Sequence, residues 1–331
     1  MAEDAARRQP PSHRRIPLAS VSRRHIQCAL GALWLLDGAL QLQPFMFGPG
    51  FAEEILAPSA EGQPSWVAAP VHFFAGLVAT APAAFNTMFA AIQILLGIGL
   101  LIPRTVRAAL TASIAWAIGV WWLGEGLGGL ASGHATLITG APGAVALYAL
   151  LAVAVWPASE VHPDASGHAP ANWLPAAWAA VWIGGAFLQS LPPQHRPTNL
   201  AAQLAAGRAA APGWLAAADR TAGHVLSAGG NALLLTLIAL MAAVGIAALR
   251  PGPSRLTAST LGAALALVFW IVGQDLGELY TGRSTDPNTG PLLIILAISV
   301  ASRARGRAPA NGTSSAHPHP RRRSVRAPVH A

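Results

Sequence analysis

Asp37 is the residue whose type and position point most directly to chemistry. It interrupts an apolar run at residues 26–47 that is long enough to cross a bilayer, and Gln41 follows it by one helical turn. A carboxylate at the centre of a bilayer costs at least about 2.5–3.5 kcal/mol unless it is paired, hydrated or protonated. We therefore expect Asp37 to accept a proton or bind a ligand inside a helix bundle. The alternative is a packing role, in which it forms a hydrogen bond to Asn86 or Gln93.

A second group of acids lies in a motif that occurs twice. The stretch WWLGEGLGGLASG at residues 121–133 returns as WIVGQDLGELYTG at residues 270–282, with Trp, Gly and Leu in register. Each copy follows an apolar run, and a carboxylate at a helix C-terminus needs water or a partner to offset the helix dipole. The candidate ligand groups in these copies are Glu125, Asp275 and Glu278, and the alternative is that they are solvated loop acids.

Two histidines form a candidate metal pair. His72 and His224 fall near the ends of two long connections, and imidazole suits transition metals at neutral pH. Neither lies in an HxxxH or CxxCH spacing, so the alternative is a pair of polar anchors at a membrane interface. We therefore do not expect haem or a tightly bound metal as a cofactor.

The composition is that of a membrane protein. Only 10% of the 331 residues are charged and 53% are hydrophobic, whereas soluble domains are about one-quarter charged. The Arg residues lie in flanks and short turns between apolar runs, so we do not expect a nucleic-acid partner. The single Cys28 excludes an intramolecular disulfide. No self-contained catalytic motif is present, and we do not expect the chain to be an enzyme on its own.

The repeated motif predicts a duplicated, all-α architecture. We expect a polytopic membrane helical bundle of eight transmembrane helices, arranged as two parallel four-helix repeats. The predicted divisions are a disordered basic tail at 1–25, the first repeat at 26–157, a linker at 158–172, the second repeat at 173–302 and a second disordered basic tail at 303–331. The predicted spans are 26–47, 86–102, a third that follows a turn with Pro103, Arg104 and Arg107 and ends at 123, and then 141–156, 173–191, 231–249, 256–272 and 290–300.

The basic residues predict the orientation of the chain in the plasma (inner) membrane. Cytoplasmic flanks of membrane helices collect Arg and Lys. One side of the predicted bundle has both Arg-rich tails, with Arg104, Arg107, Arg250 and Arg255 between them; the other has Arg196, Arg208, Arg220 and Arg283. Both termini are therefore expected in the cytoplasm, where the tails can contact anionic lipid, and the long connections are expected outside.

Part of the first half resembles the DoxX-like family of four-helix membrane proteins. IQILLGIGLLIPRTVRAAL at 92–110 is similar to a Gly-rich second helix that ends in an Arg-containing turn, and GAPG at 140–143 is similar to the entry to the last helix. The acid often found in the family's second helix is Gln93 here. The resemblance implies an accessory component of a membrane redox system, with a lipophilic or quinone-like ligand.

Three functions remain open from the sequence. The first is this redox-accessory role, the second is a small-solute or ion transporter that uses the embedded Asp37, and the third is a scaffold for an extracytoplasmic protein partner. In each case we expect a pocket between the repeats in the outer half of the membrane. Its expected lining is Asp37, Gln41, Gln93 and Gln189, with the connections that carry His72 and His224 as a cap.

Overall fold

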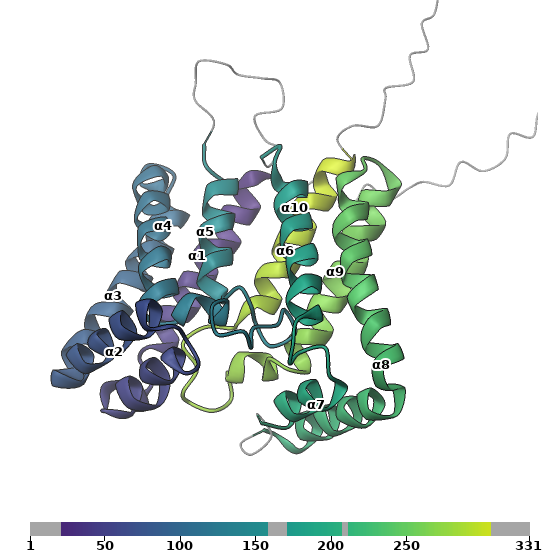
Figure 1. Ribbon diagram of the computed structural model, residues 1–331. Helices are drawn as coiled ribbons and strands as arrows, with labels where there is room; N and C mark the ends of the chain where they lie inside the picture. The colour runs from purple at the N-terminus through teal and green to yellow at the C-terminus, as the bar shows by residue number, and fades with distance from the viewer. Residues whose placement is uncertain (1–20, 158–170, 207–210, 306–331) are drawn as a thin grey trace, which may run out of the picture.

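The computed structural model describes residues 21–157, 171–206 and 211–305, and all regular secondary structure in these residues is helical (Figure 1). The two predicted tails and the linker lie largely outside these ranges. The α-helices are α1 (Arg23–Leu40), α2 (Ser65–Thr80), α3 (Pro82–Leu101), α4 (Val106–Leu123), α5 (Ala144–Ala154), α6 (Leu174–Ser190), α7 (Pro197–Ala206), α8 (Gly213–Leu249), α9 (Pro253–Ile271) and α10 (Thr289–Arg305). Short turns of helix are η1 (Pro44–Phe47), η2 (Phe51–Leu56), η3 (Ala57–Ala60), η4 (Gly126–Gly129) and η6 (Asp275–Glu278).

Four helices are long and apolar enough to cross a membrane, as expected of a membrane protein. They are α3, α4, α8 and α9. Shorter apolar helices are α2, α5 and residues 289–302 of α10. Proline and glycine set several of the boundaries: α3 and α9 have proline in the first turn, where the missing N–H costs nothing, and Gly124 caps the end of α4.

The first helix ends earlier than the expected span 26–47. α1 stops at Leu40, and Pro44 opens the separate turn η1. Asp37 therefore lies in the last turn of α1 and not at the middle of a span. Because proline has no N–H to donate to the helix, the apolar residues that follow Leu40 cannot continue α1 and fold over the bundle end instead.

The second long connection is more helical than expected. Residues 192–230 were expected to link two spans, but they contain α7 and the first part of α8. α8 bends at Gly230, whose φ of 54° and ψ of −146° lie outside the helical region. This bend separates a segment that lies across the end of the bundle from the segment that runs along it (Figure 1).

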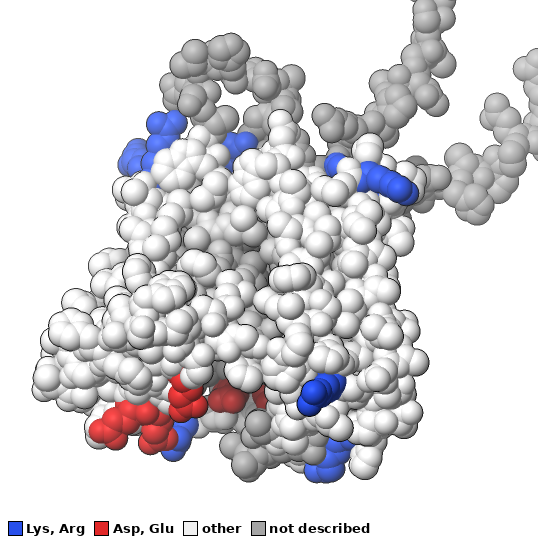
Figure 2. Space-filling model, viewed as in Figure 1, with Lys and Arg blue, Asp and Glu red and all other residues white. Residues whose placement is uncertain are grey.

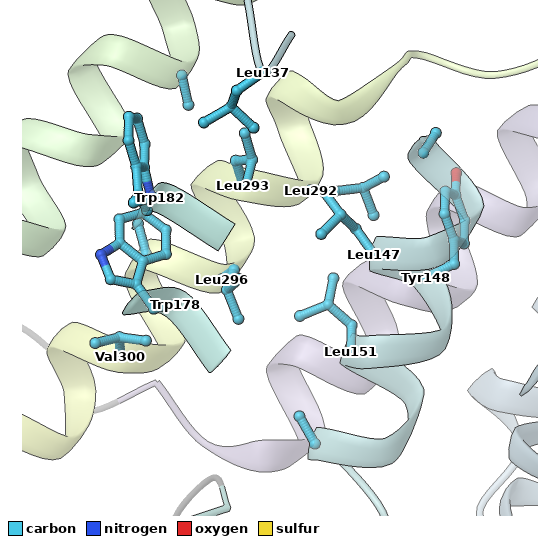
Figure 3. Close-up of a cluster of buried hydrophobic side chains, with 14 of the residues drawn as sticks. Leu137, Leu147, Tyr148, Leu151, Trp178, Trp182, Leu292, Leu293, Leu296 and Val300 are labelled. Carbon is cyan, nitrogen blue, oxygen red and sulfur yellow. The ribbon is translucent and has the colours of Figure 1, made fainter. Parts of the chain in front are cut away.

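The two halves of the chain show the same helix neighbours. α1 packs on α3 and α4 on α5 in the first half, while α6 packs on α8 and α9 on α10 in the second. α10 also contacts α5, and Figure 3 shows Leu147 and Leu151 of α5 facing Leu292 of α10. On the other side of α10 lie Trp178 and Trp182 of α6 (Figure 3), so one continuous apolar core joins the halves.

In Figure 2 the acids gather at one end of the bundle, whereas arginines are seen at both ends. At the other end the guanidinium of Arg24 and the amide of Gln27 donate hydrogen bonds to Leu100 O, which brings the start of α1 beside the end of α3. The arginines of this end are Arg23, Arg24, Arg104, Arg107, Arg250 and Arg255. The acids gather at the opposite end, over the short turns and loops, as the view in Figure 2 shows.

Candidate functional site

The main cavity lies in the first half of the chain, at the acidic end of the bundle. Its volume is about 250 Å³, and it is enclosed by α1, α3 and α4, with η2 and α2 over it. Much of its wall is aromatic: Trp34, Phe51, Phe74, Phe89 and Trp116. The Phe89 ring is central to this wall, since its centroid lies 6.2 Å from that of Phe51, 6.1 Å from that of Phe74 and 5.6 Å from that of Trp116.

Helix geometry explains how polar groups reach this apolar cavity. Trp34, Asp37 and Gln41 are spaced three and four residues apart, so they share one face of α1 and of the turn that continues it. Gln93 follows Phe89 by one turn of α3 and reaches the same cavity. Asn86, also on α3, donates a 2.6 Å hydrogen bond to Gln41 O. It therefore fixes the end of α1, and the hydrogen bond of Asn86, one of the two partners suggested for Asp37, goes to Gln41 O.

Several buried hydrogen-bond acceptors in the cavity have no donor among the described residues. Asp37, Gln41 and Gln93 are 1%, 4% and 6% exposed. Among the described residues, no donor reaches Asp37 Oδ1, Gln41 Oε1, Gln93 Oε1 or Glu125 Oε2. The Tyr148 phenol, whose ring packs 4.5 Å from that of Trp34, lies beside the Asp37 carboxyl. Buried acceptors without donors are costly, so this cavity is built to receive donors from a ligand or from water.

Glu125 and Asp286 bring two further carboxyls to the cavity. Glu125 Oε1 accepts a 3.2 Å bond from the amide of Val145 in the first turn of α5, where the helix dipole favours a negative charge. Asp286, in the loop before α10, accepts from the amide of Asn288 at 2.7 Å and from the Thr285 hydroxyl at 2.9 Å. Burial raises the pKa of both carboxyls, and the charge of Asp286 raises that of Glu125 further.

These two carboxyls also border two outer cavities. Glu125 lines a cavity of about 270 Å³ that contains Glu61 and His134. Asp286 lines a cavity of about 300 Å³ around η6 that contains the candidate residues Asp275 and Glu278. The pKa of Glu278 is raised by burial and then by the charge of Asp275. Glu125 and Asp286 therefore each line both the main cavity and one outer cavity.

A contact between the two halves closes the outer side of the main cavity. Arg283, in the loop after η6, forms a 2.5 Å ion pair with Glu54 of η2, and its guanidinium carbon lies 4.4 Å from the centroid of the Phe45 ring. Gln43 donates a 3.3 Å bond to Ser284 O in the same loop. These bonds hold the loop that carries Asp286 against the cap of the first half.

The loops after α4 and α9 have matching backbone geometry. Trp121 Nε1 donates to Pro142 O at 2.6 Å, and Trp270 Nε1 donates to Pro287 O at 2.7 Å. Where Glu125 accepts from the first turn of α5, Gln274 Oε1 accepts at 3.0 Å from Gly290 N at the start of α10. The same bond is thus made by an acid in one loop and by a neutral amide in the other.

The structure brings together only some of the residues predicted to form the pocket. Asp37, Gln41, Gln93 and Glu125 line the main cavity, but Gln189 lies in the second half and bonds to Gln194 O at 2.7 Å. The main cavity does include Thr285 and Asp286 of the second half, but its lining does not include Gln189. In the second half, Leu137 and Met241 fill the space beside Gly185. His72 and His224 are exposed, and neither lines any of the three cavities.

Sequence reasoning missed Asp286 and the aromatic wall. Asp286 lies in the second half of the chain and reaches the cavity only through the loop held by Arg283. Across the described part of the chain, no group of three or more His, Cys, Asp and Glu side chains has an arrangement that could hold a metal ion.

The raised pKa of Glu125 predicts how stability depends on pH. In the unfolded chain a Glu has a pKa of about 4.3, so between that value and the raised one the folded chain holds more protons. The free energy of unfolding must therefore fall as the pH rises through this window. Thermal unfolding in detergent should show a lower midpoint at pH 8 than at pH 5, and Glu125→Gln should lessen the drop. An equal drop in Glu125→Gln and in the exposed control Glu61→Gln would refute the assignment.

The motifs that resemble the DoxX-like family lie in helices and in the segments that lead into them. They supply few of the residues that line the main cavity. Residues 92–110 cover the second half of α3, its turn and the start of α4, and residues 140–143 lead into α5. Of the polar cavity residues, these motifs contain only Gln93. Comparison of the chain with protein-family models, with curated proteins and with solved structures found no match.

Proposed function

We propose that the chain is a transport protein that binds a small lipophilic solute in the main cavity and passes it between the bilayer and the outer surface. The observation that carries this proposal is the position of the main cavity, which shares lining residues with the two outer cavities and also reaches the exposed side of two apolar helices. Its aromatic wall reaches Met88, Ala115 and Gly119, which are exposed on the side of α3 and α4, while its carboxyls border the two outer cavities. A lipophilic molecule can enter from the lipid side and meet polar groups as it moves outward.

The proposed setting is the plasma (inner) membrane, with eight spans in two parallel repeats. The matching loops after α4 and α9 support the duplication. The end of the bundle without visible acids, where Arg23, Arg24, Arg104, Arg107, Arg250 and Arg255 lie, supports cytoplasmic termini and contact of these arginines with anionic lipid. Kinship with the DoxX-like family belongs to the same proposal and rests on residues 92–110 and 140–143.

A second candidate is the redox-accessory role with a quinone in the same cavity. Trp116 favours it, because Trp116 Nε1 lines the cavity and has no acceptor among the described residues. A quinone carbonyl would accept that N–H. An extracytoplasmic protein partner would meet the acidic outer loops in either case.

Blocking the lateral side of the cavity tests the proposal. At Gly119 of α4 an added Cβ meets nothing within 4 Å, so a larger side chain enters open space at the cavity rim without disturbing the helix packing. Wild-type protein exposed to an extract of its own membrane should retain a small molecule in native mass spectrometry, and Gly119→Leu should lose it.

Gly184 of α6 supplies the matched control. A Cβ there also meets nothing within 4 Å, but the position is far along the chain in a helix that does not line the cavity. Gly184→Leu should retain the small molecule as wild type does. A wild-type protein that retains nothing, or retention that is equal in all three proteins, would count against the proposed binding function.

A further inference from the structure

We infer that the ligand of the main cavity is an amphiphilic organic cation, whose ammonium group is held among Asp37, Glu125 and Asp286 while its apolar body lies against the aromatic wall. This inference rests on the proposed function, because it names the ligand class of the same cavity. Three independent features of the cavity carry it: its charge, its hydrogen-bonding groups and its walls.

The charge of the cavity is of one sign. Asp37, Glu125 and Asp286 line it, and its lining contains no Arg, Lys or His. Arg283, in the same loop as Asp286, is engaged by Glu54 and by the Phe45 ring. Carboxyls that share a poorly hydrated space raise one another's energy when ionised, and a cation among them removes that cost.

Several hydrogen-bonding groups of the cavity are acceptors that a ligand could supply with donors. The oxygens Asp37 Oδ1, Gln41 Oε1 and Gln93 Oε1 are buried and lack donors among the described residues. An ammonium group carries donors or polarised C–H groups in several directions and satisfies such acceptors together. A quinone offers only acceptors, so it would leave the two glutamine oxygens unmet.

The walls of the cavity suit the rest of an organic cation. Aromatic faces attract cations through their quadrupoles and also accept apolar groups. Trp34 and Trp116 line the cavity, and Phe89, whose ring centroid lies 5.6 Å from that of Trp116 and 6.1 Å from that of Phe74, continues the aromatic wall. A benzyl group with a small ammonium head is therefore a suitable probe for a cavity of about 250 Å³.

Proton release should accompany binding of the cation. The groups that face Asp37 are Asp286, Tyr148 and Glu125, and those that share a cavity with Glu125 also include Glu61 and His134. Burial raises the pKa of Glu125 and Asp286, so the empty site holds protons above the ordinary range of carboxyls. A cation favours the ionised forms and displaces these protons, so its affinity should rise with pH through the titration of both groups.

Benzyltrimethylammonium and its uncharged isostere neopentylbenzene provide the test, since they differ only in the central nitrogen or carbon. Binding to the protein in nanodiscs is followed by the change in total tryptophan fluorescence, to which Trp34 and Trp116 of the cavity contribute, with Gly119→Leu as the blocked reference. The wild type should bind the cation at least about tenfold more tightly than the isostere. Asp37→Asn should lower the affinity for the cation by about thirtyfold or more, because it removes one partner of a buried charge pair. It should leave the affinity for the isostere unchanged, which also shows that the variant is folded.

The outcomes separate this inference from the proposed function. If the isostere or duroquinone binds as tightly as the cation and Gly119→Leu abolishes both, the cavity binds ligands but the cationic class is wrong. If no probe binds and Gly119→Leu is indistinguishable from wild type, the proposed function also fails. An affinity for the cation that does not rise between pH 5 and pH 8, or no difference in released protons between buffers of different ionisation enthalpy, would overturn the proton-linked part.

Discussion

Replacing Gly128 by alanine should prevent the loop after α4 from closing and should cost far more stability than any surface substitution. Gly128 has φ 60°, and an alanine Cβ there would overlap the carbonyl group of Pro142. The left-handed conformation alone costs alanine about 1–2 kcal/mol. The overlap adds to this cost, because Pro142 O also accepts the hydrogen bond from Trp121 Nε1 and cannot move away without breaking it.

Gly133 provides the matched control in the same loop. Its φ is 75°, but an added Cβ meets nothing within 4 Å. Gly133→Ala should therefore show the conformational cost alone, of about 1–2 kcal/mol. Unfolding of purified protein in mixed micelles of rising SDS content measures both. Equal losses in Gly128→Ala and Gly133→Ala would show that the contact with Pro142 is unimportant.

The same comparison in the second half tests whether the two loops are equivalent. A Cβ at Gly277 would lie 2.6 Å from Pro287 C, whereas a Cβ at Gly282 would have its nearest neighbour at 3.5 Å. Gly277→Ala should therefore be much more destabilising than Gly282→Ala, as in the first loop. If Gly282→Ala were instead more destabilising than Gly277→Ala, the two loops would not be structurally equivalent. That result would weaken the case for a duplicated architecture.

The sequence predicted the helices well because their signals are local. Apolar runs interrupted by proline or glycine placed α4, α6 and α9 within a few residues of their observed bounds. The same local reasoning found half of the site, since Asp37 and Gln41 are four residues apart and must share a face of one helix. It failed at the end of α1, where a continuous apolar run hid the change of direction before Pro44.

The remainder of the site depends on packing between distant segments, which no local pattern contains. Asp286 reaches the cavity because Arg283 binds Glu54, an interaction between the two halves. Gln189 was assigned to the pocket by assuming that the halves contribute alike. The structure differs because Leu137 and Met241 occupy the space beside Gly185, where the first half has Asp37. A duplicated sequence thus predicts shared backbone geometry but not shared chemistry.

The loops after α4 and α9 show how two such halves can diverge. Glu125 and Gln274 accept equivalent backbone hydrogen bonds, so either residue can close its loop. Only Glu125 also has an oxygen without a donor at the main cavity, while Gln274 uses its amide nitrogen to bond to Leu137 O at 3.4 Å. Glu125 therefore presents an acceptor to the main cavity, whereas Gln274 bonds to the first half of the chain at Leu137 O.

Trp34→Ala should combine a large loss of stability with a change in the cavity. Trp34 is fully buried, donates a 2.8 Å hydrogen bond to Ser113 Oγ and packs against Tyr148. Replacing a buried tryptophan with alanine costs about 3–5 kcal/mol. The cost should lie at the upper end here, because Ser113 loses its partner and the aromatic pair, worth about 0.5–1.5 kcal/mol, is also lost.

Substitutions at Trp122 and Trp182 distinguish the contribution of burial from that of the Trp34 hydrogen bond to this loss of stability. Trp122→Ala removes a side chain that is 42% exposed and should change the unfolding free energy in SDS micelles by no more than about 0.5 kcal/mol. Trp182 is as buried as Trp34, but its Nε1 has no acceptor among the residues described. Trp182→Phe should therefore lower the free energy of unfolding less than Trp34→Phe, because Trp34→Phe leaves the Ser113 hydroxyl without its donor. Equal costs would show that the Trp34 hydrogen bond contributes nothing, and the stability at this position would then come from the packing of its ring against Tyr148 alone.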